Sequence, residues 1–414
     1  MENKTEQKQY ATSHYLHYPE GEFPPYLAYG FRPIFLLLAP YIIFLILMWS
    51  LMYSGVISIP FIGDMLSWHI YEFLYGVGTA GIMAFLFTGL PELFPGVVPM
   101  VGKRLQYVVA LWVAGRVSFW FMDILGVYVV AIINLALVVW IIVWAFKPVV
   151  LDPLQRHSSI AYTIVGLFLI EIWFFASKAN LVETSALEIL KVALGGFMVL
   201  ELLALRRVNM ESMNEILEDE GVDDVFVAKP PRYNLAIFTV ALFTFVEFFF
   251  PDNSTLGWIG FAAAAAILGI LNDFILEDTN ILLKPFTLFM MSIIVLMSLG
   301  YGFMGYDYLN DNIYGVNHFR HFLTTGVFGL SFFMVMIIIS TVHTGRHLKA
   351  NFWIWLSVIL IIVATFMRAL IPFYEEHMMT LSAVSAVLWA IPFGIYIKLY
   401  FKFLLSPRAD GIPG

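Results

Sequence analysis

Two residues that can bind a metal or move a proton, His69 and Glu72, open a long apolar stretch of the sequence, LSWHIYEFLYGVGTAGIMAFLFTGL at 66–90. Residues three apart lie on the same face of a helix. A neutral imidazole is a good ligand for iron or copper, and a nearby carboxylate can orient it or handle protons. Ionisable residues inside an apolar helix are costly, so they mark a functional interior by default.

Three more histidines lie at the two ends of a second apolar stretch, at 318–341. His318 and His321 open it, again three residues apart, and His343 follows its end. At 1.5 Å per residue, His343 lies roughly 33 Å along a helix from His321, so one cofactor cannot contact both. From the residues alone, His343 reads as part of a helix end that Gly345 and Arg346 complete.

Other apolar stretches also contain charged residues. With Glu72, the set is Arg116, Glu171, Glu201, Glu247 and Arg368, and Arg320 lies at the entrance of the stretch at 318–341. One reading is a buried ion-pair network that fixes helix packing. A second treats the histidines at helix entrances as ordinary interfacial residues.

A third reading of the same residues is a cofactor site. Two histidines from different helices can clamp one haem b, whose propionates need arginine partners. Arg116, Arg320 and Arg368 are at suitable depth for that role. The pair His318 and His321 can instead hold copper, which also favours imidazole.

The elements that must position these residues are membrane helices. Of the 414 residues, 61% are hydrophobic and only 13% are charged, and a bilayer-spanning helix needs roughly 20 apolar residues. The sequence therefore predicts an all-α bundle of about twelve transmembrane helices. They are expected at 31–53, 66–90, 105–122, 125–146, 160–176, 186–205, 234–250, 255–272, 285–303, 318–341, 352–372 and 378–403. With no cysteine, disulfides, iron–sulfur ligation and covalently attached haem are excluded.

The distribution of Lys and Arg predicts the orientation of this bundle. The two tails and alternate loops hold most of these residues, whereas the opposite loops hold only Lys178, with Lys191 and Arg320 at helix entrances. Positive residues mark the cytoplasmic side, so both termini are expected there. His69, His318 and His321 then lie near the outer face. We expect a polar tail at 1–30, a single membrane domain at 31–403 with a cytoplasmic loop at 206–233, and a flexible tail at 404–414.

Six segments, in order along nearly the whole chain, carry a resemblance to a known family. They are YGFRPIFLL at 29–37, WHIYEFLYG at 68–76, LWVAGR at 111–116, HFLTTGVFG at 321–329, VHTGR at 342–346 and SPRADGIPG at 406–414. The set resembles the NnrS family of bacterial inner-membrane proteins. The resemblance implies a haem- and copper-containing protein of about twelve spans, associated with nitric oxide metabolism and tolerance. The matching positions are Arg32, Trp68, His69, Glu72, Gly115, Arg116, His321, Thr324, Gly326, His343, Gly345 and Arg346. A second ligand site at His343 is implied only by this resemblance.

The chain departs from the family pattern at two positions where a histidine is expected. Tyr71 replaces the second histidine of the segment at 68–76, and Met291 stands near the position of a histidine in the ninth span. Methionine can ligate haem iron or copper. Met291 is therefore either a substituted ligand or the sign that one metal centre is lost.

The resulting hypothesis places His69 as an axial ligand of haem b near the outer face, with Glu72 beside it and His321 as the second ligand. The protein would act on nitric oxide or metal–nitrosyl species, with quinol as one electron source that no motif identifies. Two alternatives stay open. One is a proton-coupled transporter that uses the buried Glu and Arg, and the other is a non-catalytic haem- or copper-binding assembly or sensing protein. None of these hypotheses decides whether the protein is an enzyme. No feature of the sequence predicts nucleic-acid binding.

Overall fold

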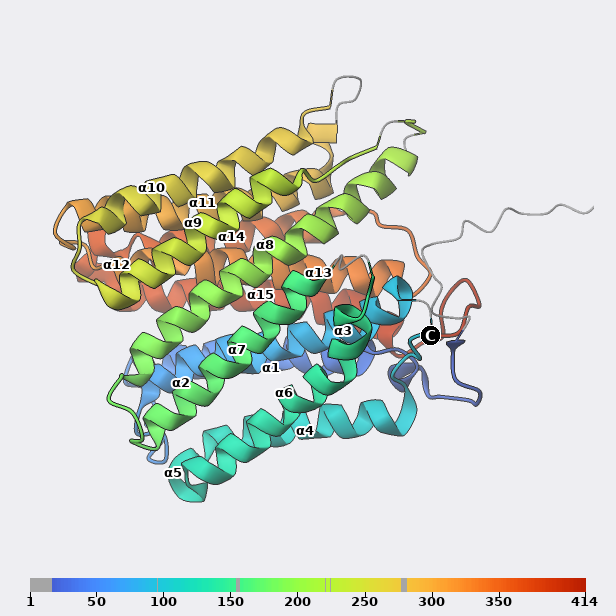
Figure 1. The fold of residues 1–414 in the computed structure, drawn as a ribbon, viewed down its shortest axis with the longest axis horizontal. Helices are drawn as coiled ribbons and strands as arrows, with labels where there is room; N and C mark the ends of the chain where they lie inside the picture. Colours follow the sequence, from blue (N-terminus) through green and yellow to red (C-terminus); the bar gives the residue numbers. More distant parts are fainter. Residues whose placement is uncertain (1–16, 95, 154–156, 220, 224, 277–280) are drawn as a thin grey trace, which may run out of the picture.

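The computed structural model describes residues 17–94, 96–153, 157–219, 221–223, 225–276 and 281–414. Every regular element in these residues is a helix (Figure 1). The α-helices are α1 Phe31–Tyr53, α2 Met65–Tyr71, α3 Gly78–Leu93, α4 Gly102–Trp120, α5 Met122–Leu125, α6 Val127–Val150, α7 Ser158–Lys178, α8 Ala186–Asp219, α9 Pro230–Phe249, α10 Thr255–Leu268, α11 Pro285–Leu309, α12 Val316–Phe319, α13 Gly329–Val342, α14 Phe352–Ala369 and α15 Met378–Leu404.

Ten helical segments of the described chain are long and apolar enough to cross a membrane, which makes this a multi-pass membrane protein. Of the twelve expected spans, α4 and α8 are not among the ten. Both are helices at the expected places, but α4 carries Lys103, Arg104 and Arg116, and α8 carries Glu188, Lys191 and Glu201. Their charge lowers their hydropathy, so the count of twelve remains a prediction.

Neighbours in sequence pack as antiparallel pairs, and the first and last long helices pack together. The pairs α4–α6, α7–α8 and α9–α10 are in contact, as are α1 and α15 (Figure 1). Helix α4 lies alongside α6, and α8 runs diagonally between α7 and α9 (Figure 1). Both therefore run within the bundle, alongside helices that qualify as spans.

The carboxyl tail is held in place, contrary to the flexible tail that was expected. Arg32, fully buried at the start of α1, donates hydrogen bonds to the carbonyls of Phe403, Leu404, Ser406 and Gly414 at 2.7 to 3.1 Å. The last carbonyls of a helix have no partner within it, and a guanidinium has five donors to offer them. The two ends of the described chain thus meet at one end of the bundle, as an even number of spans requires (Figure 1).

The expected loop at 206–233 is mostly helix. Helix α8 continues from the bundle to Asp219, and α9 begins at Pro230. The sequence KPPRY at 229–233 starts this helix. Proline suits the first helical position because the missing N–H is unpaired there in any case.

The two spans that carry His69 and His321 share an irregularity. A π-helical segment, Glu72–Val77, joins α2 to α3, and another, Phe322–Phe328, joins α12 to α13. Such segments occur frequently at functional sites because they re-aim the neighbouring side chains. Gly76, within the first segment, leaves room for the side chains of Glu72 and Arg116, since a Cβ there would lie 2.5 Å from Glu72 Oε2 and 2.7 Å from Arg116 Nη1.

Candidate functional site

Three histidines and one arginine gather where α2, α12 and α14 meet. His321 interacts electrostatically with Arg368, His69 and His318, so the structure brings these four side chains together. All four are half-buried. The predicted pairing of the second and tenth spans is therefore present in the fold.

The carbonyl oxygens of its own helix fix the orientation of the His321 ring. Its Nδ1 lies 3.1 Å from the carbonyl oxygen of Asn317 and 3.2 Å from that of His318. Because a carbonyl can only accept, Nδ1 carries the proton and donates it. The lone pair of the imidazole is then on Nε2, which is the arrangement seen in metal-bound histidines.

His69 is held by aromatic rings and not by hydrogen bonds. Its ring stacks on Trp49 with centroids 3.8 Å apart and an angle of 10° between the planes, and Phe73 packs edge-on at 5.2 Å. Its Nδ1 is buried and has no hydrogen-bond partner among the described residues. A buried polar nitrogen without a partner is costly, which points to a ligand for this ring.

Arg368 contributes a cation with no carboxylate beside it. Its Nη1 donates to Nδ1 of His318 at 3.2 Å, and no ion pair joins it to an acidic residue in the part of the chain that the structure describes. Since the arginine can only donate, Nδ1 of His318 carries no proton, and its lone pair accepts this hydrogen bond. His318 is therefore a poorer metal ligand than His321.

Glu72 does not contact His69, which corrects the expected role of this carboxylate. It is fully buried, and its Oε2 accepts hydrogen bonds from Arg116 at 2.8 Å and from Tyr41 at 2.7 Å. Arg116 also donates to Asn134 of α6. The pair joins the second span to α4 and α6, as a structural ion-pair network would.

Arg320 is also already paired. It donates to Glu247 of α9, which accepts a further hydrogen bond from Tyr308 of α11, and its Nε donates to Asn317 at 3.0 Å. Of the three arginines predicted to hold propionates, only Arg368 is therefore without a carboxylate partner.

Met291 lies away from the histidine cluster. It is 18 residues before the end of α11 at Leu309, whereas His321 follows that end in sequence. Phe303 of α11 stacks on Phe322 with centroids 5.3 Å apart, so His321 lies level with that part of α11. Met291 lies twelve residues earlier, roughly 18 Å away along the helix, which is too far for a ligand of the same cofactor as His321.

His343 lies at the opposite end of its span and pairs with a carboxylate. Its Nδ1 is 3.0 Å from Glu92 Oε1, its ring packs edge-on against Tyr29 at 5.8 Å, and its carbonyl accepts from Arg408 at 3.0 Å. These contacts join the end of the tenth span to the chain ends. They favour the structural reading of His343 over a ligand role.

Tyr71, at the position where the family has a histidine, faces a different partner. Its hydroxyl donates to Glu171 Oε1 at 2.6 Å, and its ring stacks on Phe119 at 3.9 Å and on Phe174 at 4.7 Å. Sequence reasoning singled out Glu171 and Tyr71 separately but did not pair them. The sequence did hold a sign that Tyr71 and His69 have different partners: they are two residues apart, so they lie on different faces of the helix.

No group of three or more His, Asp or Glu side chains in the described residues is arranged to hold a metal ion. The cluster instead offers the imidazole of His321 with its lone pair on Nε2, the imidazole of His69 with an unpartnered Nδ1, and the guanidinium of Arg368 without a carboxylate partner. That donor set fits an iron macrocycle with two axial ligands and acidic side groups better than a copper ion held by protein alone.

Comparison with known proteins gives one match. The family model described as NnrS protein matches residues 25–408. No curated protein and no solved structure is significantly similar to the chain. The match spans five of the six segments that carry the resemblance and the first three residues of the sixth, at 406–408, and so the chain belongs to the NnrS family.

Proposed function

We propose that this protein binds haem b between the second and tenth spans and acts in nitric oxide metabolism or in tolerance of nitrosative stress. The chain belongs to the NnrS family, and the proposed link to nitric oxide rests on what the resemblance to that family implies. His321 and His69 are the residues that would hold the haem iron. The bound haem would supply an iron that binds nitric oxide and changes redox state.

The observation that carries the proposal is the hydrogen bonding of His321. Its Nδ1 donates to the helix carbonyls of Asn317 and His318, which leaves Nε2 as the ligand atom without any rearrangement. His69, from another helix, has a buried nitrogen that the protein does not satisfy. A ligand that both nitrogens can bind would explain both features.

Arg368 is the proposed partner of a haem propionate. An arginine–carboxylate pair is charge-assisted and is frequently bidentate. Arg116 and Arg320 are not proposed for this role, because each already pairs with a buried glutamate.

Copper is a weaker proposal than haem. His318 and His321 share a face, but Arg368 occupies Nδ1 of His318, and the described residues offer no three-ligand group. We also propose, from the charge distribution, that the protein lies in a bacterial inner membrane with both termini in the cytoplasm. Quinol is the proposed electron donor if the protein turns over.

The test is the optical spectrum of detergent-purified protein, oxidised and reduced, after expression with adequate haem and copper. We expect a b-type spectrum that His69→Ala and His321→Ala each shift or abolish, and that Arg368→Gln weakens through lower haem retention. His343→Ala is the matched control and should leave the spectrum unchanged. Spectra that respond to His343→Ala and not to His321→Ala would contradict the assignment.

The same preparation separates the alternatives. Colourless wild-type protein without metal would contradict the haem proposal and favour the transporter, which the buried glutamates make plausible. Haem binding without turnover of nitric oxide would favour an assembly or sensing role.

A further inference from the structure

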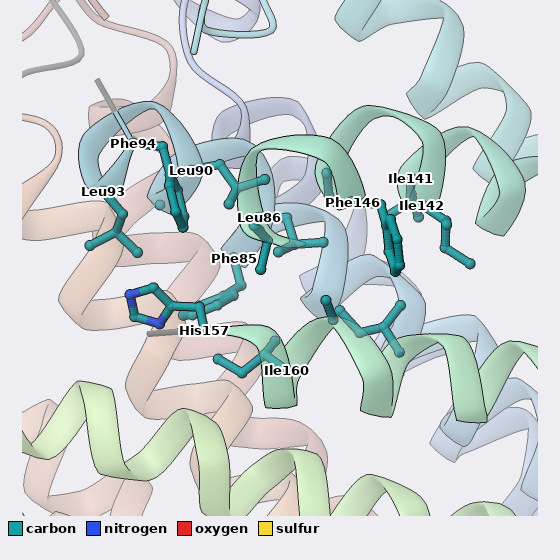
Figure 2. A pocket seen from close by; sticks show the side chains of 15 residues that line it. Phe85, Leu86, Leu90, Leu93, Phe94, Ile141, Ile142, Phe146, His157 and Ile160 are labelled. Carbon is teal, nitrogen blue, oxygen red and sulfur yellow. The ribbon is translucent and has the colours of Figure 1, made fainter. Parts of the chain in front are cut away.

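Three neighbouring cavities follow helix α7 through the bundle. The first, of about 30 Å³, lies between α3, α6 and α7, with His157 at one end and Phe85 and Ile160 on its walls (Figure 2). The second, of about 100 Å³, shares Phe85 and Ile160 with the first. The third, of about 10 Å³, lies on the other side of Ile164, which lines all three. The three cavities are therefore neighbours that share parts of their walls.

Each of the two inner cavities has one glutamate in its wall. The second cavity is apolar except for Glu201 of α8 and Ser331 of α13. The Ser331 hydroxyl lies close enough to Glu201 to interact with it, but it is buried and completes no hydrogen bond of normal geometry. A buried hydroxyl without a partner, beside a cavity of this size, indicates ordered water.

Glu171 of α7 stands at the third cavity with one oxygen unsatisfied. Its Oε1 accepts from Tyr71 at 2.6 Å, whereas its Oε2 is buried and has no partner among the described residues. The cavity is just large enough for one water molecule, for which roughly 10–15 Å³ is needed. Tyr75 also lines it and donates to the carbonyl of Leu167 at 3.0 Å.

Three polar side chains surround Glu171 in the bundle. The groups that face it are Tyr71, Tyr75 and Arg116, and Arg116 is already paired with Glu72. Two carboxyl groups and one guanidinium are electrically neutral only when one carboxyl group is protonated. A proton on Glu171 Oε2 would lie toward the small cavity, where water can accept it.

We propose that these cavities form a proton-transfer route between Glu201 and Glu171. When the Glu171 carboxyl group is ionised, a proton leaves the Glu201 carboxyl group for water in the second cavity, passes Ile164, and reaches the Glu171 carboxylate through the water of the third cavity. Glu201 is left ionised and takes up a new proton from the water of the second cavity. This route is independent of haem, because it uses only buried carboxyl groups, a hydroxyl and water.

The narrowest point of the route is apolar. Ile82, Ile164 and Phe197 line both the second and the third cavity, so water can join the two only past these side chains. A larger side chain at Ile164 should close the passage without touching either glutamate. Leu169, on the same helix but 58% exposed, provides the matched control for added volume.

The experiment follows the carbonyl-stretch band of protonated carboxyl groups by infrared spectroscopy, with and without perfusion by D₂O, on the purified full-length protein. We expect a band component that Glu171→Gln removes and a second that Glu201→Gln removes. In Ile164→Phe the Glu171 component should remain, but its proton should exchange for deuterium about tenfold more slowly, because the larger side chain raises the barrier to proton transfer between the cavities. Leu169→Phe should exchange at the wild-type rate.

Each result bears on the route. Slowed exchange of the Glu171 component in both Ile164→Phe and Glu201→Gln supports it. Exchange at the wild-type rate in both variants would overturn it, since Glu171 would then be reached from another side. Absence of a Glu171 component from the wild-type band would also overturn it, because the proton would not reside there.

Discussion

At the scale of residues, the protein uses its buried arginines in two ways. Arg116 and Arg320 each face a buried glutamate, and both pairs are completed by a tyrosine hydroxyl. Arg368 faces only a neutral histidine. The first kind fixes the packing of helices, and the second leaves a positive charge for an acidic group to neutralise.

Removing one member of the pair between Glu72 and Arg116 should be far more harmful than removing both. Arg116→Leu leaves the Glu72 charge buried without a partner, and such changes cost about 3–5 kcal/mol of unfolding free energy. The double variant Glu72→Gln with Arg116→Met should recover most of that loss. Thermal unfolding in detergent measures both, and equal losses in the single and double variants would show that the pair is not coupled.

At the scale of elements, the helix ends depend on residues far away in sequence. Arg32 at the start of α1 holds the carbonyls at the end of α15. Arg408 of the tail donates to the carbonyl of His343 and pairs with Asp410. The segments at 29–37, 342–346 and 406–414 thus form one connected cluster, which explains why three separate motifs occur together.

Loss of Arg32 should release the tail. In Arg32→Gln, trypsin should cut after Arg408, a residue only 5% exposed in the folded chain, about tenfold faster, which corresponds to about 1.4 kcal/mol of local opening. Mass spectrometry of the released peptide measures the rate. Lys349→Gln, on an exposed connection, is the control. Identical rates in wild type and Arg32→Gln would show that the tail is held by other contacts.

Acid should release the same tail. Burial raises the pKa of the Asp410 carboxyl group, but hydrogen bonds from Arg408 and from the Ile412 N–H outweigh it and hold the pKa below its usual value. A group with a lowered pKa stabilises the fold above its ordinary pKa and loses that effect as the pH falls through the folded value. Protection of Arg408 from an acid-tolerant protease that cleaves at arginine should therefore be pH-independent near neutrality and fall in acid. Asp410→Asn should remove the pH dependence.

At the scale of the whole molecule, the topology follows from which helices cross the bilayer. If α4 and α8 cross with the other ten, the connections at Ile124 and Glu183 lie outside and Lys103 lies inside. If they do not cross, Ile124 and Glu183 lie inside. The chain has no cysteine, so Ile124→Cys, Glu183→Cys and Lys103→Cys can be labelled one at a time. A membrane-impermeant thiol reagent on intact cells should label the first two only, and labelling of Lys103→Cys alone would overturn the orientation.

Much of the fold could be predicted because bilayer thickness sets helix length. The stretch expected at 31–53 is α1, Phe31–Tyr53, and that expected at 285–303 begins at Pro285 as predicted. The start of α9 at Pro230 was missed because it lies outside the apolar stretches. The ordered tail was missed because its partners lie on other helices.

The candidate site was predicted in part. The sequence paired His69 with His321 because the predicted orientation puts both near the outer face, where two histidines could hold a haem, and the fold places them within electrostatic reach. It could not show that Glu72 turns toward Arg116, because the π-helical segment that begins at Glu72 breaks the regular spacing of side chains. Nor could it separate Arg368 from the paired arginines, since that depends on contacts between distant helices.

The central claim, a haem held by His69 and His321, is tested most directly by electron paramagnetic resonance of the oxidised, haem-loaded protein. Two histidine ligands predict a low-spin iron signal in the wild type. His321→Ala should convert it to high spin, and added imidazole should restore low spin by replacing the missing ligand. A signal that His321→Ala leaves unchanged would contradict the claim, because the iron would then be bound elsewhere.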